Sequence, residues 1–167
     1  MENVPKTALV YVGLDFIGDG LMKLPFVRAM RNALPETKIT WLAGKGSSVY
    51  NGILSPLVSD LLDEVIDNAN IGSKFSELFS RPLQERQFDL IIDTQRRVLT
   101  TLIIRRIPHL VFISGSANFL LSSRSPKKGY KKPKSMIQQM LNLLELATGK
   151  APSISKPLKI NDKYLNT

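Results

Sequence analysis

One aspartate, Asp19, stands between two glycines shortly after an apolar run, and it is the strongest candidate for chemistry in this chain. The run, Ala8 to Val12, is typical of a buried strand, and the segment after Asp19 has helical spacing. In α/β folds, ligands bind beyond the carboxyl ends of the strands, where Asp19 would lie. A carboxylate there can accept the proton of an attacking hydroxyl group. From these residues alone, a second role, in which Asp19 caps the helix, is favoured.

The residues around Asp19 predict a flexible turn followed by a helix. Gly18 and Gly20 leave the backbone free to bend and let a ligand approach it closely. One buried stripe with helical spacing follows, made of Leu21, Leu24, Val27, Met30 and Leu34. Pro25 fits this helix if its first turn begins near Met22. Lys23 lies one turn after the aspartate and is placed to pair with its carboxylate.

A second group of polar residues follows the apolar strand expected at 90–92. Asp93, Gln95, Arg96 and Arg97 come directly after it, again on the ligand side of an α/β sheet. Two adjacent guanidinium groups can hold a carboxylate or a phosphate through paired hydrogen bonds. A solvated helix start is the alternative interpretation of the two arginines.

The positive charge of the chain is concentrated in one segment. Residues 96–134 carry ten basic and no acidic side chains, Arg124, Lys127 and Lys128 among them. Such a block indicates an anionic partner, either a phosphate, an acidic sugar, a nucleic acid or a lipid surface, although a solvated loop is the alternative. Tyr130 is the only aromatic residue within the lysine run, so nucleic acid is the weaker explanation.

The elements needed to position these residues alternate between strands and helices. Strands are expected at 38–42, 64–66 and 109–113, and helical segments at 49–62, 73–87, 98–104 and 136–148, the last with Gly149 as its C-cap. Pro56 interrupts the first of these helical segments, and Pro82 bends or breaks the second. This alternation predicts an α/β fold, a Rossmann-like, mainly parallel sheet with helices on both faces.

Several classes of site and location are disfavoured by composition. The 167 residues include no cysteine and one histidine, His109, so disulfides and thiolate metal sites are excluded. Asp15 and Asp19 lack an evident third ligand, and we expect no metal. The glycine spacing does not match a dinucleotide-binding motif, and we expect no cofactor. The N-terminus is not a signal peptide and no apolar run is long enough to span a membrane, which favours the cytoplasm.

Four short segments follow one another near the start of the chain, namely Ile17-Gly18-Asp19, Leu24-Pro25, Val27-Arg28-Ala29 and Ala33-Leu34-Pro35. In these segments the chain resembles the opening of the family-nine glycosyltransferases, which include the lipopolysaccharide heptosyltransferases. The similarity continues through Ile39 to Leu42 and Phe88 to Gln95 and ends near Gly149. It implies the N-terminal half of a two-domain GT-B fold, with a Rossmann-like acceptor-binding domain at 1–149 and a linker at 150–167 toward an absent donor-binding domain.

The resemblance also implies a function. Asp19 would be the catalytic base of an inverting heptosyl or hexosyl transfer from a nucleotide-sugar, which the second domain would bind. An anionic glycan or glycolipid acceptor would bind at the first domain, near Gly18, Gly20, Lys23, Gln95, Arg96, Arg97, Arg124, Lys127 and Lys128. Peripheral contact with the inner face of an anionic membrane fits such an acceptor. The chain alone would be inactive or nearly so, as a fragment, a split half or a remnant.

The sequence departs from the family pattern at Gly13, Asp15, Phe16, Lys23 and Arg96. The alternative function is therefore a non-catalytic module whose basic surface holds an anionic glycan, a membrane or a nucleic acid.

Overall fold

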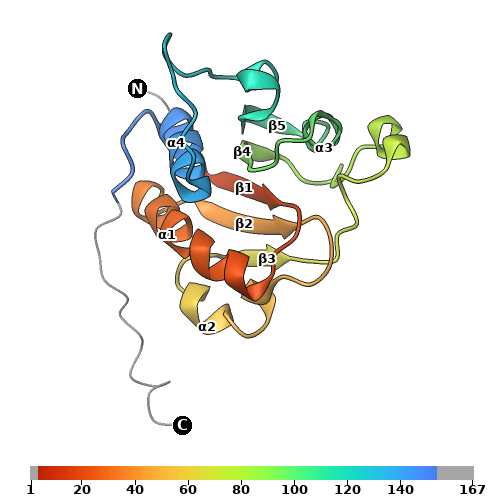
Figure 1. Ribbon diagram of the computed structural model, residues 1–167. Helices are drawn as coiled ribbons and strands as arrows, with labels where there is room; N and C mark the ends of the chain where they lie inside the picture. The colour runs from red at the N-terminus through yellow and green to blue at the C-terminus, as the bar shows by residue number, and fades with distance from the viewer. Residues whose placement is uncertain (1–3, 154–167) are drawn as a thin grey trace.

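The computed structural model describes residues 4–153 and contains a five-stranded sheet in which all paired strands are parallel (Figure 1). The strands are β1 (Thr7–Val12), β2 (Lys38–Ala43), β3 (Glu64–Ile66), β4 (Phe88–Asp93) and β5 (His109–Ser114). Their order is β3-β2-β1-β4-β5, which places β1 at the centre. The predicted α/β, Rossmann-like fold is confirmed.

Helices cover both faces of this sheet. On one face, α1 (Ile17–Ala33) and α4 (Met136–Thr148) pack against apolar side chains such as Val10, and α2 (Ser55–Val58) and the 3-10 turn η1 (Val49–Asn51) extend this layer. On the other face, α3 (Val98–Ile104) packs against side chains such as Leu9. Two further 3-10 turns are η2 (Phe75–Phe79) and η3 (Ser116–Phe119).

The register aligns the last residues of the strands along one edge, which we call the carboxyl edge. Val12 pairs with Ala43, Tyr11 with Asp93, and Asp93 with Ser114. The loops that follow β1 and β4 therefore leave the sheet side by side, because their strands are neighbours. The opposite edge, where the strands begin, is called the amino edge.

Helix α1 begins five residues earlier than the sequence predicts. It starts at Ile17, not near Met22, so Pro25 lies inside the helix and leaves one carbonyl without its intrahelical donor. Leu21, expected in the buried stripe, is 49% exposed. Gly20 takes its place against the core, and the next residue points about 100° away around the helix axis.

The helix expected at 73–87 is mostly absent. Only η2 forms, because the Glu77 carboxylate accepts hydrogen bonds from the backbone of Gly72, Ser73 and Lys74 and holds that segment in a tight turn. Leu83 has a positive φ of 50°, which a helix does not allow. Residues 49–62 likewise break into η1 and α2.

Helix α4 has the predicted bounds. The Ser135 hydroxyl accepts a hydrogen bond from the Gln138 amide at its start, and Gly149 adopts a left-handed conformation, with φ of 71°, at its end. The division into a domain at 1–149 and a linker at 150–167 stays a prediction, since residues 154–167 lie outside the described part of the chain.

Candidate functional site

Asp19 lies in the first turn of α1, at the carboxyl edge. The N-cap of this helix is Phe16, with no side-chain cap, so the predicted capping role of Asp19 is wrong. Its side chain is partly exposed, and among residues 4–153 it has no hydrogen-bond or ion-pair partner. A negative charge in the first turn is favoured by the helix dipole. The carboxylate is therefore accessible and available to a ligand.

The two glycines beside Asp19 have different surroundings. A Cβ added at Gly18 would meet no atom within 4 Å, so this residue borders open space. At Gly20 an added Cβ would lie 2.4 Å from Val49 Cγ2, and the Tyr50 hydroxyl donates to the Gly20 carbonyl at 2.6 Å. Gly20 is thus needed to pack α1 against η1, whereas Gly18 leaves room beside the carboxylate.

Lys23 pairs with Asp15, and the predicted pairing with Asp19 is wrong. Its ammonium lies 3.1 Å from Asp15 Oδ1, and both side chains are almost fully buried. The other oxygen of Asp15 accepts hydrogen bonds from Trp41 Nε1 at 3.0 Å and Ser48 Oγ at 2.6 Å. Lys23 faces inward because it lies three residues after Gly20, on the same buried side of the helix.

This buried network fixes the loop between β1 and α1. Lys23 also donates to the Leu14 carbonyl at 3.2 Å, so both loop and helix are tied to β2 through Asp15. Burial, together with the charge of Asp15, raises the pKa of Tyr50 well above its usual value. This network was not predicted from the sequence. The available signal was the spacing of Asp15 and Lys23, eight residues apart, because Asp19 is the only other charged residue between them.

Gln95 joins the loop after β4 to the loop after β1. A Cβ added at Gly13 would lie 2.8 Å from Gln95 Oε1, so the amide of Gln95 rests on the backbone of Gly13. The Gln95 backbone amide donates to Asp93 Oδ1 at 2.9 Å. Asp93 is fully buried and also accepts hydrogen bonds from the hydroxyls of Thr101 and Ser114. Asp93 therefore positions Gln95 near the start of α1.

The stability of the protein should depend on pH through Asp93. Burial raises the pKa of its carboxyl from 3.8 to about 6, against the lowering effect of its hydrogen bonds. The unfolded chain ionises this group at lower pH, so its contribution to the free energy of unfolding falls by about 3 kcal/mol between about pH 4 and pH 7. Urea unfolding over this range should show the fall in the wild type and lose it in Asp93→Asn. Parallel pH profiles for the two proteins would contradict this assignment.

Arg96 and Arg97 lie at the carboxyl edge with exposed side chains. The Arg96 guanidinium donates to the side-chain oxygen of Gln139, in the first turn of α4. Arg97 is the N-cap of α3, and its guanidinium has no hydrogen bond or ion pair to other residues in the range 4–153. One arginine is therefore held in place and the other is open to an anion.

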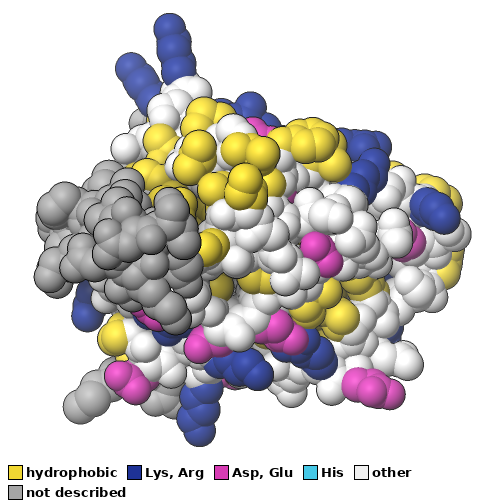
Figure 2. Space-filling model, turned by 90° about the horizontal axis from the view of Figure 1, so that it is seen from below, with side chains coloured by type: hydrophobic (Ala, Val, Ile, Leu, Met, Phe, Trp, Pro, Cys, Tyr) yellow, Lys and Arg dark blue, Asp and Glu magenta, His cyan; other side chains and the backbone are white. Residues whose placement is uncertain are grey.

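Large hydrophobic side chains are exposed around the start of α1. They are 49–65% exposed and consist of Leu14, Phe16, Ile17, Leu21 and Met22. Figure 2 shows hydrophobic side chains gathered along the upper border of the face seen from below, near two projecting basic side chains. An apolar patch of this kind usually marks a surface that binds another molecule.

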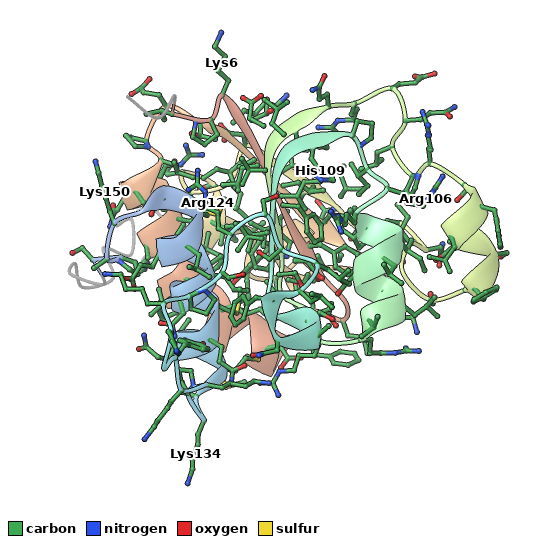
Figure 3. All side chains as sticks on the ribbon, turned by 90° about the horizontal axis from the view of Figure 1, so that it is seen from above. Lys6, Arg106, His109, Arg124, Lys134 and Lys150 are labelled. Atoms are coloured by element: carbon green, nitrogen blue, oxygen red, sulfur yellow. The ribbon has the colours of Figure 1, made fainter. Side chains whose placement is uncertain are left out.

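The loop at 124–130 forms a second basic region. Arg124, Lys127 and Lys128 line a hollow of about 730 Å³ between this loop and α4, together with Glu145. Arg124 donates to the carbonyls of Leu146 and Ala147, at the last turn of α4, whereas Arg96 contacts Gln139 at the first turn. About 12 Å of helix separates these contacts. Figure 3 likewise shows Arg124 and Lys134 toward opposite ends of α4.

The structure thus separates the predicted binding residues into two places. Asp19, Gly18, Gln95, Arg96 and Arg97 share the carboxyl edge, and Arg124, Lys127 and Lys128 line the hollow beside α4. Within the described residues, no group of three or more His, Asp or Glu side chains is placed to hold a metal ion. No helix among residues 4–153 is long and apolar enough to cross a membrane.

The parallel sheet and its strand order, with helices on both faces, define a Rossmann-like α/β domain. An accessible carboxylate, that of Asp19, lies at the carboxyl edge of this sheet. Comparison with solved structures places this fold with GT-B sugar transferases. The chain is similar to a family-nine glycosyltransferase from Veillonella parvula, with a TM-score of 0.62 and 19% identity over 91% of this chain. It is also similar to heptosyltransferase WaaC of E. coli, solved with ADP-2-deoxy-2-fluoro heptose, with a TM-score of 0.61 and 19% identity over 90% of this chain.

The resemblance to family-nine glycosyltransferases, which the sequence indicated, is thereby confirmed at the level of the fold. The chain spans 44% of the Veillonella protein and 50% of WaaC, that is, about half of each. No protein-family profile and no curated protein sequence matches the chain.

Proposed function

We propose that this chain is the acceptor-binding part of an inverting sugar transferase and that Asp19 is its catalytic base. The observation that carries this proposal is the Asp19 carboxylate itself, which is accessible, has no hydrogen-bond or ion-pair partner among residues 4–153, and lies at the carboxyl edge of a fold shared with glycosyltransferases. An acceptor hydroxyl loses its proton to this carboxylate while its oxygen bonds to the anomeric carbon of the donor sugar. The bond from that carbon to the nucleotide diphosphate breaks on the opposite side, which inverts the configuration.

Residues beside Asp19 are proposed to hold the acceptor sugar. Gly18 leaves space for the sugar ring, Gln95 can bind a hydroxyl group, and Arg96 and Arg97 attract acidic substituents. The proposed role of Gly20 and Lys23 is indirect, because both are buried and shape the loop. The hollow lined by Arg124, Lys127 and Lys128 would hold a more distant phosphate of the same acceptor, about 12 Å along α4.

The donor is proposed to be a nucleotide-sugar, of the heptose or hexose class, that binds a second domain. The described residues provide the fold of about half a transferase, and a domain across the carboxyl edge would bring the donor to Asp19. We therefore expect residues 1–167 alone to be nearly inactive. The acceptor and donor classes fit lipopolysaccharide synthesis at the inner face of the cytoplasmic membrane.

The apolar patch around Phe16 and Ile17 supports a peripheral membrane contact. The patch lies at the carboxyl edge, where Arg96 contacts Gln139 in the first turn of α4. Lys134 projects near the start of the same helix (Figure 3). Apolar side chains flanked by lysines bind anionic membranes through burial and charge together. Such a contact would hold the protein near a lipid-linked acceptor.

Acceptor binding can be tested without transfer activity. The variant in which Lys127, Lys128, Lys131 and Lys132 are all replaced by Ala should bind a phosphorylated glycolipid at least about tenfold more weakly, with a weaker dependence on salt. Asp19→Asn should bind this acceptor as well as the wild type. Sedimentation with anionic vesicles measures the membrane contact, and Phe16→Ser with Ile17→Ser should reduce it.

A transfer assay with an added donor-binding domain decides between this proposal and a non-catalytic binding module. Such a module would lose binding in the lysine variant but show no transfer under any reconstitution. Unchanged acceptor binding in the lysine variant would show that the hollow beside α4 is not part of the acceptor site.

A further inference from the structure

A second cluster of arginines lies at the amino edge, away from Asp19. Arg105 and Arg106 follow the end of α3, and Arg81 follows η2. Figure 3 shows Arg106 and His109 on the side of the molecule opposite Lys134. Two adjoining hollows, of about 810 and 400 Å³, share Arg81 and Arg106 in their lining. The three arginines therefore border one continuous surface.

These guanidinium groups are poorly compensated within the protein. The guanidinium groups of Arg81 and Arg105 have no hydrogen bond or ion pair to any residue between 4 and 153, and both side chains are exposed. Arg106 donates from Nε to the Ser80 carbonyl at 2.7 Å, which fixes its orientation and leaves its terminal nitrogens to solvent. In the part of the chain that the structure describes, Glu85 is the only carboxylate that lines either hollow.

A neighbouring arginine, Arg86, has a structural role and serves as a comparison. Arg86 lines the larger hollow, but its guanidinium forms an ion pair with Glu64 at 2.6 Å and lies 5.1 Å from the centre of the Phe88 ring. Its charge is thus neutralised inside the protein. Arg81, Arg105 and Arg106 have no such acid, and they repel one another unless an anion binds between them.

We propose that Arg81, Arg105 and Arg106 form a phosphate-binding site at the amino edge, separate from the proposed transferase site. Guanidinium groups bind phosphate through paired hydrogen bonds, and a phosphate has enough oxygens to be shared by several arginines. The shallow hollows suit a charged group that remains partly in water. The Phe79 ring, 80% exposed, lines the larger hollow, and its centre lies 6.1 Å from that of the Phe75 ring, which is 67% exposed. The phosphate therefore belongs either to a soluble compound or to a lipid headgroup beside which the rings insert.

The test uses the 167-residue chain with the four loop lysines at 127, 128, 131 and 132 replaced by Ala, so that this loop does not contribute. Inorganic pyrophosphate is titrated by calorimetry, and vesicles of phosphatidylcholine with phosphatidic acid are titrated by sedimentation. Arg81→Ala with Arg105→Ala breaks no side-chain hydrogen bond or ion pair within the described residues, so it should fold normally. We expect it to lower affinity for the bound probe at least about tenfold. Arg28→Ala with Lys45→Ala removes the same charge elsewhere and should change affinity less than about twofold.

The two probes separate the sources of the phosphate. Binding of pyrophosphate that depends on Arg81 and Arg105 supports a soluble ligand. A lipid headgroup is supported if the protein binds vesicles but not pyrophosphate, if this binding depends on Arg81 and Arg105, and if Phe79→Ser weakens it. Binding of neither probe, or equal affinities for the arginine variant and its charge-matched control, would overturn the proposal. Neither result bears on Asp19, because the two sites lie at opposite edges of the sheet.

Discussion

Asp19→Asn is expected to lower the rate of sugar transfer by about 100-fold to 10,000-fold when the chain is supplied with a donor-binding domain. The amide has the shape of the carboxylate but cannot accept the proton of the acceptor hydroxyl. The structure leaves this carboxylate without an internal partner, so the substitution breaks no contact within residues 4–153. Its effect should appear in kcat, with the affinity for acceptor nearly unchanged.

Initial rates with a nucleotide-sugar and an anionic glycan acceptor measure this effect. Asp19→Glu, which keeps the carboxylate on a longer side chain, should recover part of the rate. Asp60→Asn is a matched control, because Asp60 is an exposed carboxylate that follows α2 and is not part of the proposed site. Full transfer by Asp19→Asn would show that the base is a different group.

Lys23→Met should lower the free energy of unfolding by about 3–5 kcal/mol, the largest stability effect we expect from one charged residue in this protein. The substitution leaves the carboxylate of Asp15 buried, with its hydrogen bonds to Trp41 and Ser48 but without a counter-charge. The penalty arises from the unpaired charge, since methionine fills a similar volume.

Urea unfolding of four proteins tests this interpretation. They are the wild type, Lys23→Met, Asp15→Asn and the double variant, which form a double-mutant cycle. The double variant should recover most of the loss, because a neutral amide at residue 15 needs no ammonium. Lys45→Met, at an exposed lysine, should change stability by less than about 0.5 kcal/mol. A loss below about 1 kcal/mol in Lys23→Met would mean that the pair contributes little.

The order and type of most elements could be predicted from the sequence. Apolar runs gave β4 and β5 to within two residues, and helical spacing gave α3 and α4 with their observed bounds. These elements are readable because each has a regular pattern that local packing preserves. The helices expected at 49–62 and 73–87 do not form as continuous helices. Gly52 ends the turn η1, and the Glu77 carboxylate accepts a hydrogen bond from the Gly72 backbone, and neither effect can be predicted from the spacing of apolar residues.

The positions of the charges and of the exposed apolar residues could not be predicted in this way. The basic residues of the segment 96–134 lie in three separate places, namely the carboxyl edge, the amino edge and the loop beside α4. The first two are separated because α3 runs from the carboxyl edge at Arg97 to the amino edge at Arg105. Leu21 was expected to be buried but is exposed, and Lys23 is buried instead. The reason is that Gly20 packs against η1, and each residue of the helix points about 100° away from the one before it.

The sequence by itself determined the α/β fold class, the position of Asp19 at the start of the first helix and the concentration of positive charge after Gln95. These follow from residue types and local spacing. Only the tertiary structure decided that Lys23 neutralises Asp15, that Asp19 keeps an open carboxylate, and that arginines gather at both edges of the sheet. Such pairings depend on which faces of separate helices and strands contact each other. These contacts are determined by tertiary packing around the sheet and not by the local spacing of residues in the sequence.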